Sequence, residues 1–298
     1  MADLDGLTEV SACLRPSCQR LAALLTCHNR REQTLHCLAS LAAAKAVVSS
    51  HVDVDTFLVD DGCSDGTTAA VRAQFPDVRV IAGTGNLFWC GGMGLAWTHA
   101  AAHDYDGYLW LNDDVTLDQD AIERLVAASR RLSRDDGAVI VVGATRAEEA
   151  GAVDTATYGG LDSQGVLPAS AEVRRIELFN GNIVLVSRRA FQVLGGLSKA
   201  YTHGLADIDY GVRAKKAGVP VWLAAGSLGS CSANKTARWQ RADLPVWTRL
   251  RELHRPTGCP PWQLARLVWS NGGWWFPWSV AKLYCEALFP GWSAPKND

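Results

Sequence analysis

Short apolar runs alternate with helical patterns from residue 21 onward. The runs are LAALLTC (21–27), DTFLVDD (55–61), VRVIAG (78–83), GYLWLNDD (107–114) and AVIVVGA (138–144). Runs of this length, separated by helices, are typical of strands that are buried on both faces. The alternation therefore predicts an α/β fold with a mostly parallel central sheet covered by helices on both faces. Asn29 followed by Glu32 resembles a capping box that opens the first helix.

The pattern changes in the second half of the chain. Residues 151–180 are short polar stretches interrupted by glycine and proline, which predicts a hairpin or a loop on the acceptor side. IVLVS (183–187) is expected to be a strand that returns to the sheet. Residues 236–298 hold eight of the twelve tryptophans together with six arginines. We therefore expect a catalytic domain at 1–235, with 1–19 flexible or peripheral, and a helical appendage at 236–298.

Composition limits the partners and the compartment. The 298 residues are 48% hydrophobic and carry a net charge of -2, so no global positive field attracts nucleic acid or an anionic bilayer. The nine cysteines are scattered and form no Cys-x-x-Cys pair, which favours reduced thiols. The acidic start does not resemble a secretory signal, and no apolar run reaches the length of a spanning helix. We expect a cytoplasmic protein with no nucleic-acid partner.

Acidic residues follow two of the predicted strands, at the edge where ligands bind in open α/β sheets. Asp60 and Asp61 follow TFLV and offer short acceptors for a nucleobase or ribose. The alternative is that they cap the turn SDGTT and the helix after it. Asn112, Asp113 and Asp114 follow GYLWL, and such oxygen ligands suit a hard divalent ion that also grips a diphosphate.

A structural interpretation of the second cluster is also open, because Asp114 and Asp118 are placed to cap the helix DQDAIERLVAASRRL. A third acidic pair, Asp207 and Asp209, opens DIDYGVRAKKAG. Asp209 is spaced to pair with Arg213 one turn later. Asp207 is the candidate to face the crevice as a general base, and the nearby His203 is a rival base.

The segment GTGNLFWCGGMGLAW has glycines but lacks the spacing of a dinucleotide-binding or phosphate-binding loop. We expect Gly91 and Gly92 to make room for a flat ligand beside Trp89, with the indole as a sugar platform. Packing of Phe88 and Trp89 in the core is the alternative.

Six segments occur in an order that resembles family-2 inverting glycosyltransferases of the GT-A (nucleotide-diphospho-sugar transferase) fold. They are LLTCHNR, VDDGCSDGT, GNLFWCGGMG, YLWLNDDV, FNGNIVLVSR and HGLADIDYGVRAKKAG, spread over residues 20–235. The chain is most similar to bacterial rhamnosyl- and galactofuranosyl-transferase-like enzymes that build surface polysaccharides of the cell envelope, such as O-antigen. One departure is Ala206, which stands where many members have Glu.

The resemblance implies roles for particular residues. The donor would be bound by Thr26, Asn29, Arg30, Asp60, Asp61, Asn86, Trp89, Gly91, Gly92, Asn112 and Asp113. Asp114 would be the metal ligand, for Mg²⁺ or Mn²⁺, and Asp207 the catalytic base, with Asp209 as the other candidate. Contacts with acceptor or diphosphate would come from Asn180, His203, Asp209, Asn234 and Lys235.

The implied reaction is a single displacement of a sugar from a nucleotide-diphosphate donor, a dTDP- or UDP-sugar such as dTDP-rhamnose, to a hydroxyl of a glycan or lipid-linked oligosaccharide. Residues 240–298 would either lie on the inner face of the plasma membrane, or pack on the catalytic domain or a second copy in a homodimer. Three other classes stay open: a sugar nucleotidyltransferase, a non-catalytic carbohydrate-binding protein, and a retaining transferase.

Overall fold

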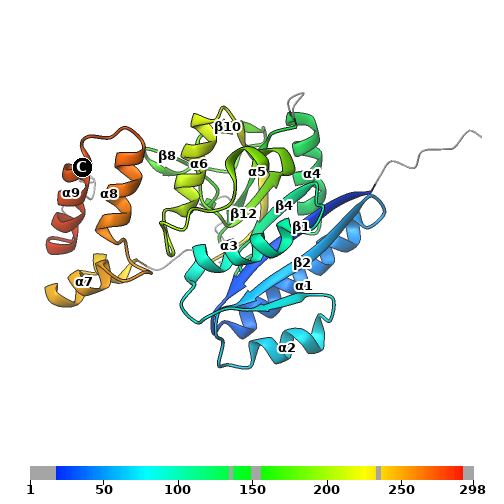
Figure 1. The fold of residues 1–298 in the computed structure, drawn as a ribbon, viewed down its shortest axis with the longest axis horizontal. Coiled ribbons are helices and arrows are strands. Elements are labelled where there is room, and N and C mark those ends of the chain that lie inside the picture. The colour runs from blue at the N-terminus through cyan, green and yellow to red at the C-terminus, as the bar shows by residue number, and fades with distance from the viewer. Residues whose placement is uncertain (1–17, 134–136, 149–155, 233–235, 291–298) are drawn as a thin grey trace, which may run out of the picture.

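A ten-stranded sheet forms the centre of the protein. Figure 1 shows strands of this sheet with helices around them. The computed structural model describes residues 18–133, 137–148, 156–232 and 236–290. The eight strands on the main path of the sheet are β1 (Gln19–Cys27), β2 (Val52–Asp60), β3 (Arg79–Ala82), β4 (Gly107–Leu111), β6 (Ile140–Arg146), β10 (Arg174–Ile176), β12 (Ile183–Ser187) and β13 (Val221–Ser230). Two short strands, β5 (Thr116–Leu117) and β7 (Ala156–Tyr158), pair with β13 and β6.

The sheet is mostly parallel, as the alternating pattern predicts. Its order is β10-β13-β6-β12-β4-β1-β2-β3. Strands β3, β2, β1 and β4 run parallel to one another, and β6 runs parallel to β13. Strand β12, the returning strand expected at 183–187, is antiparallel to both β4 and β6.

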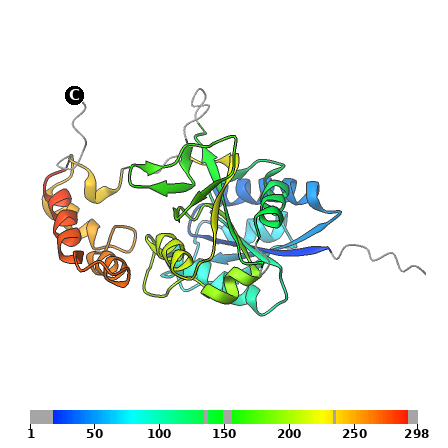
Figure 2. The same ribbon diagram turned by 90° about the horizontal axis from the view of Figure 1, so that it is seen from above.

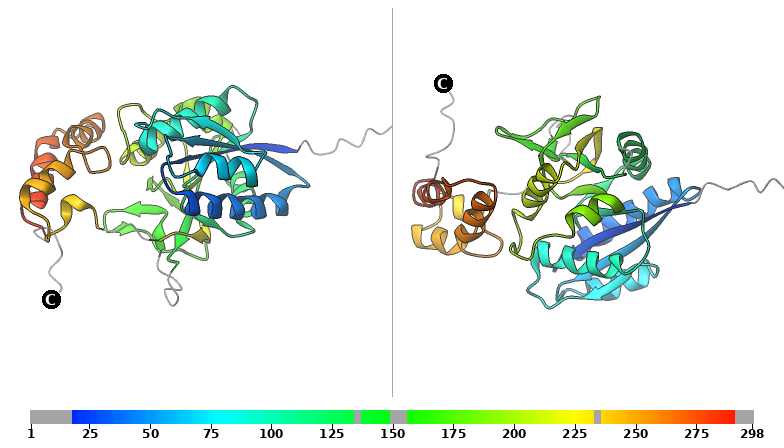
Figure 3. Two further views of the ribbon diagram at one scale, coloured as in Figure 1. Left: turned by 90° about the horizontal axis from the view of Figure 1, so that it is seen from below. Right: turned by 45° about the horizontal axis from the view of Figure 1, so that its top comes forward.

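Helices cover both faces of the sheet (Figures 2 and 3). One face packs against α1 (Arg31–Val48), α2 (Thr67–Gln74) and α4 (Ala121–Leu132). The other packs against α3 (Phe88–Ala101), α5 (Arg188–Leu194) and α6 (Ala206–Lys216). Successive residues of β1 alternate between the two cores, since Leu21 and Ala23 belong to the first and Ala22 and Leu24 to the second. Burial on both faces explains why the strand is a continuous apolar run.

A small second sheet lies beside the main one. Its strands are β8 (Gly160–Asp162), β9 (Gly165–Val166) and β11 (Leu178–Phe179), paired in the order β11-β8-β9. Strands β8 and β9 form the antiparallel hairpin expected within 151–180. The first part of that segment, residues 151–155, lies outside the described residues.

The described part of the expected appendage, residues 236–290, is mostly helical. It contains a 3₁₀ helix η1 (Arg238–Gln240) and the helices α7 (Val246–Leu253), α8 (Pro261–Ser270) and α9 (Phe276–Leu288). These helices share a small core of Trp239, Leu253, Leu283 and Ala287. The buried Arg249 donates from Nε to the Ala287 carbonyl at 2.8 Å and so caps the end of α9.

The helical appendage meets the α/β part through α8. Leu267 of α8 packs with Cys90 and Tyr201, and Gln263 Nε2 donates to Thr202 Oγ1 at 3.0 Å. Figure 1 shows α8 between α6 and the outermost helix α9. None of the helices in the described part of the chain has the length and apolar character needed to cross a membrane.

Candidate active site

A cavity of about 490 Å³ lies at the carboxyl ends of β1 and β4. Ten residues that the sequence singled out line it: Thr26, Arg30, Asp61, Trp89, Asn112, Asp113, Asp114, Asn180, His203 and Asp207. They come from the ends of β1, β2, β4 and β11, from the start of α3, and from the first turn of α6 and the loop before it. The fold therefore brings Asp114 and Asp207, which are far apart in the sequence, to the wall of one cavity.

Arg30 joins the two aspartates that follow β4. Its Nη1 donates to Asp113 Oδ1 at 2.8 Å and to Asp114 Oδ2 at 2.9 Å. Burial raises the pKa of Asp113 to about 6, and the Arg30 guanidinium opposes that rise. Asp114 is the more exposed of the two, with a side-chain exposure of 26% against 8%. Asp114 is therefore the carboxylate more accessible to a ligand in the cavity.

The capping interpretation of Asp114 and Asp118 does not describe the structure. Helix α4 begins at Ala121, and no side chain caps its start. Asp118 instead forms a two-pronged ion pair with Arg146, with both N–O distances at 2.8 Å. Asp114 thus has no local structural role at the helix start, which strengthens its candidacy as a ligand-binding residue.

The donor set at this end of the cavity fits a hard divalent ion. Asp113 and Asp114 offer carboxylate oxygens, the ligands that Mg²⁺ and Mn²⁺ prefer. Asp114 Oδ1 is 3.7 Å from the Cys231 thiol, which is only a weak donor. Cys27, Asp60 and Cys63 also place ligand atoms within 4.8 Å of one another, but two thiols are poor ligands for these ions.

Asp207 lines the same cavity from the start of α6. Its Oδ2 accepts the backbone N–H of Gly181 at 3.0 Å. Burial raises the pKa of Asp207, while the N–H groups of Gly181 and Ile208 partly offset the rise. A carboxylate with a raised pKa is a stronger proton acceptor once it is ionised.

Trp89 lies between Asn112 and Gly181. Its Nε1 donates to Asn112 Oδ1 at 2.7 Å, and its ring lies so close to Gly181 that an added Cβ would be 2.6 Å from Cζ2. The ring also packs against the core between the sheet and α3. Trp89 is thus half-buried against the core and also lines the cavity, and its role as a sugar platform stays a prediction.

The two aspartates after β2 have different positions. Asp60 accepts the Cys63 N–H at 2.7 Å and the Thr68 hydroxyl, which is the turn role given as the alternative. Asp60 does not line the cavity.

Asp61 lines the cavity, but backbone groups use its acceptors. Its Oδ1 accepts from Gly85 at 2.7 Å, and its Oδ2 accepts from Leu87 at 2.8 Å and Phe88 at 2.9 Å. Asp61 therefore holds the loop before α3 against the end of β2.

The capping box expected at Asn29 and Glu32 is wrong. Helix α1 begins at Arg31, whose N–H donates to Asp65 Oδ2 at 3.0 Å. Asn29 has a φ of 51°, and its side-chain oxygen accepts from Ser64 at 2.7 Å. Asn29 therefore fastens the end of β1 to the next loop and does not line the cavity.

Two side chains near Asp207 also line the cavity. Burial, and to a lesser extent the positive charge of Arg30, lowers the pKa of His203 below its usual value. The side-chain oxygen of Asn180 is buried and has no hydrogen-bond partner among the described residues. Such an unpaired acceptor is costly unless a ligand meets it.

Four other candidates lie off the cavity lining. Asp209 is buried, pairs with Arg213 Nε at 2.8 Å and accepts from the Tyr201 hydroxyl. Gly91 and Gly92 lie inside α3, and the space beside Gly92 is taken by Thr26, whose Oγ1 would be 2.1 Å from an added Cβ.

The remaining candidate off the lining is Asn86, which is exposed in the loop before α3. Asn234 and Lys235 lie outside the described residues.

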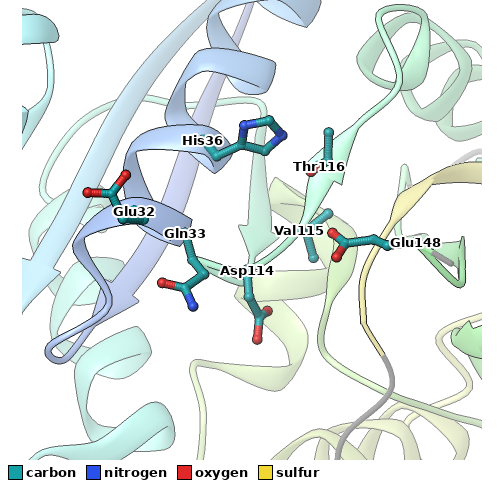
Figure 4. Close-up of a pocket in the computed structure, with 7 residues that line it drawn as sticks. All are labelled: Glu32, Gln33, His36, Asp114, Val115, Thr116 and Glu148. Atoms are coloured by element: carbon teal, nitrogen blue, oxygen red, sulfur yellow. The ribbon is translucent and has the colours of Figure 1, made fainter.

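A second cavity of about 500 Å³ shares Asp114 (Figure 4). Its other lining residues are Glu32, Gln33, His36, Val115, Thr116 and Glu148. Asp114 thus stands between two cavities, but the first is the one that gathers the residues selected from the sequence.

Sequence reasoning missed several residues of the first cavity. Tyr158 and Thr257 come from β7 and from the loop between α7 and α8, which contain none of the motifs used. Cys27, His28 and Gly181 lie within quoted motifs, where they could have been found by their position beside chosen residues. Thr257 shows that the appendage contributes to the cavity wall.

Comparisons with known proteins agree with this geometry. The model of the family Glycosyl transferase family 2 matches residues 23–159. No curated protein sequence matches the chain.

Two solved structures are similar in fold. The mannosyltransferase PcManGT from Pyrobaculum calidifontis, in complex with GDP-Man and Mn²⁺, has a TM-score of 0.52 and 15% identity, covering 91% of this chain and 81% of that one. S. aureus TarS 1-349, in complex with UDP-GlcNAc, has a TM-score of 0.52 and 10% identity. The match covers 93% of this chain and 73% of the TarS chain. They confirm the predicted GT-A fold.

Proposed function

We propose that this protein is a metal-dependent inverting glycosyltransferase that moves a sugar from a nucleotide-diphosphate donor to an acceptor hydroxyl. The observation that carries the proposal is that Arg30, Asp113, Asp114 and Asp207 line one cavity. Leaving-group stabilisation and proton acceptance are the two tasks of an inverting displacement, and the first three residues and Asp207 can divide them.

The donor's diphosphate belongs at the Arg30 and Asp114 side. Arg30 is a fixed positive charge that can interact with phosphate oxygens. A divalent ion held by Asp114, with Asp113 beside it, would neutralise the charge that develops on the leaving diphosphate. Asp61 contributes by fixing the loop at 83–88, which closes this side of the cavity.

The acceptor belongs at the Asp207 side. Asp207 accepts the proton of the attacking hydroxyl, and its raised pKa favours that transfer. The N–H of Gly181 holds one carboxylate oxygen, which orients the group. The unpaired Asn180 oxygen and the Trp89 ring supply a hydrogen-bond acceptor and a flat surface for the sugar. Attack opposite the leaving group inverts the anomeric centre.

A nucleotide-diphosphate sugar as donor is supported by the two structures of similar fold, which hold GDP-Man and UDP-GlcNAc. Within that class we propose a dTDP- or UDP-sugar and, as acceptor, a glycan or lipid-linked oligosaccharide of bacterial surface-polysaccharide synthesis.

A panel of nucleotide sugars tests the function. Thermal unfolding is measured with each donor in the presence of Mn²⁺, Mg²⁺ or EDTA, and donors that stabilise the protein are then assayed for release of nucleoside diphosphate. We expect at least one donor to stabilise the protein, and we expect this stabilisation to require Mn²⁺ or Mg²⁺. The NMR spectrum of the product should show that the configuration at the anomeric carbon is inverted relative to the donor. Stabilisation by no donor, or a retained anomer, contradicts the proposal.

A further inference from the structure

The appendage (residues 236–290) exposes most of its tryptophans. Six are more than half exposed: Trp247 (81%), Trp262 (57%), Trp269 (64%), Trp274 (79%), Trp275 (52%) and Trp278 (70%). Only Trp239 is buried in the appendage core. The four tryptophans of the α/β part are all buried or half-buried. Packing within this chain therefore does not explain the aromatic content of the appendage.

Five of these side chains lie on the hairpin of α8 and α9. Trp262 and Trp269 are seven residues apart and share the outer face of α8, with the exposed Arg266 between them. Trp278 and Lys282 are one turn apart on the outer face of α9. Trp274 and Trp275 occupy the turn between the helices. We call these five tryptophans, with Arg266 and Lys282, the tryptophan surface.

The opposite faces of the two helices are already covered. Leu267 of α8 packs against the α/β part, and Leu283 of α9 packs in the appendage core. The tryptophan surface therefore points away from the helices' own packing partners. Several exposed tryptophans on one helical hairpin are typical of an interaction site.

The charge of the appendage indicates which kind of partner binds the tryptophan surface. Residues 236–290 contain seven Lys and Arg but three Asp and Glu, whereas the whole chain has a net charge of -2. Of the three acidic residues, Glu252 is buried and paired with Arg238 and Arg255, and Glu286 lies 3.8 Å from the ammonium of Lys282. The exposed charge of the appendage is thus positive, while the remainder of the protein is negative.

A second copy of the chain fits this surface poorly. A two-fold dimer places the same patch on both sides of the interface, so that Arg266 and Lys282 would meet the same positive patch of the partner. Anionic phospholipid headgroups pair with those charges, and indole rings favour the boundary between headgroups and acyl chains. Both features of the surface are satisfied at a lipid bilayer.

We propose that the tryptophan surface docks this protein on the anionic face of a phospholipid membrane. Docking is peripheral and involves the side chains of the α8–α9 hairpin. The loop between α7 and α8 carries Thr257 into the cavity wall, so the docked appendage also borders the cavity. A lipid-linked acceptor would then reach the cavity from the membrane to which the enzyme is bound. This access route rests on the proposed function, whereas membrane docking itself does not.

Vesicle flotation tests the proposal with the full chain. The probes are phosphatidylcholine vesicles with and without phosphatidylglycerol. We expect flotation with the anionic vesicles, a tenfold or greater loss of binding in Trp274→Ser/Trp278→Ser, and loss of the anionic preference in Arg266→Glu/Lys282→Glu. Val47→Ser on α1, which removes another exposed apolar side chain, is the matched control and should bind like wild type.

Several outcomes overturn docking. They are failure of the wild-type chain to float, tryptophan variants that still float fully, and a dimer in analytical ultracentrifugation that the same tryptophan substitutions abolish. Nucleoside diphosphate release with a water-soluble acceptor is measured on the same variants. A protein that releases nucleoside diphosphate but does not float contradicts only docking. A wild-type protein that floats but has no activity contradicts only the proposed function.

Discussion

Gly181→Ala should disturb the cavity by displacing Trp89. The glycine has no left-handed φ, so alanine can adopt its backbone conformation. The new Cβ would lie 2.6 Å from Trp89 Cζ2 and 2.7 Å from Cη2, whereas ordinary contact begins near 3.4 Å. The indole must therefore move by roughly 1 Å, although its bond to Asn112 holds it in place.

The magnitude follows from that displacement. Overpacking of this kind costs about 1–3 kcal/mol of stability, and a shift of about 1 Å in a positioned group costs about 10²-fold in rate. Urea denaturation and nucleoside diphosphate release measure the two effects. Gly94→Ala is the matched control, because open space surrounds that position. In the double variant with Trp89→Phe, the smaller ring should restore much of the stability. A Gly181→Ala protein with wild-type stability and turnover refutes the steric reasoning.

Three further predictions follow from the same contacts. Gly92→Ala should destabilise the protein by about 1–3 kcal/mol, because its Cβ would collide with Thr26, whereas Gly94→Ala in the same helix should be neutral or stabilising in thermal unfolding. Asp209→Asn should lower the free energy of unfolding by about 1–3 kcal/mol and leave turnover of the folded protein unchanged, since it loses only the Arg213 pair; a loss of turnover at full folding would contradict this. The pKa of Asp113 is raised to about 6, so the folded protein takes up a proton there that the unfolded chain does not. The free energy of unfolding should therefore rise by about 1 kcal/mol as the pH falls from 7 to 5. Urea denaturation at the two pH values measures this rise, and the Asp113→Asn variant should not show it.

The strands could be predicted from the sequence because burial on both faces leaves a continuous apolar run. The runs at 21–27, 55–61 and 107–114 predicted β1, β2 and β4, and the polar residues that follow them line the cavity or its loops. The change to a tryptophan- and arginine-rich composition after residue 235 also indicated the helical appendage. Strands and helices are formed by residues close together in the sequence, so the spacing of apolar residues along the chain predicts them.

Contacts between distant residues were not predictable in this way. The start of α1 is capped by Asp65 from another loop, so the local Asn29 and Glu32 signal failed. Asp207 and Asp209 both suit a helix start, and only the positions of Gly181 and Arg213 separate the cavity residue from the ion-paired one. The exposure of the appendage tryptophans likewise depends on which helix faces are covered.

The central claim is that Asp207 receives the acceptor proton in a cavity whose other side holds the donor. The direct measurement is turnover of Asp207→Asn with a donor that stabilises the wild-type protein, alongside calorimetric binding of the same donor with Mn²⁺. We predict a loss of about 10²–10⁴-fold in rate with donor binding close to that of wild type. Turnover equal to that of wild type in Asp207→Asn would contradict the account.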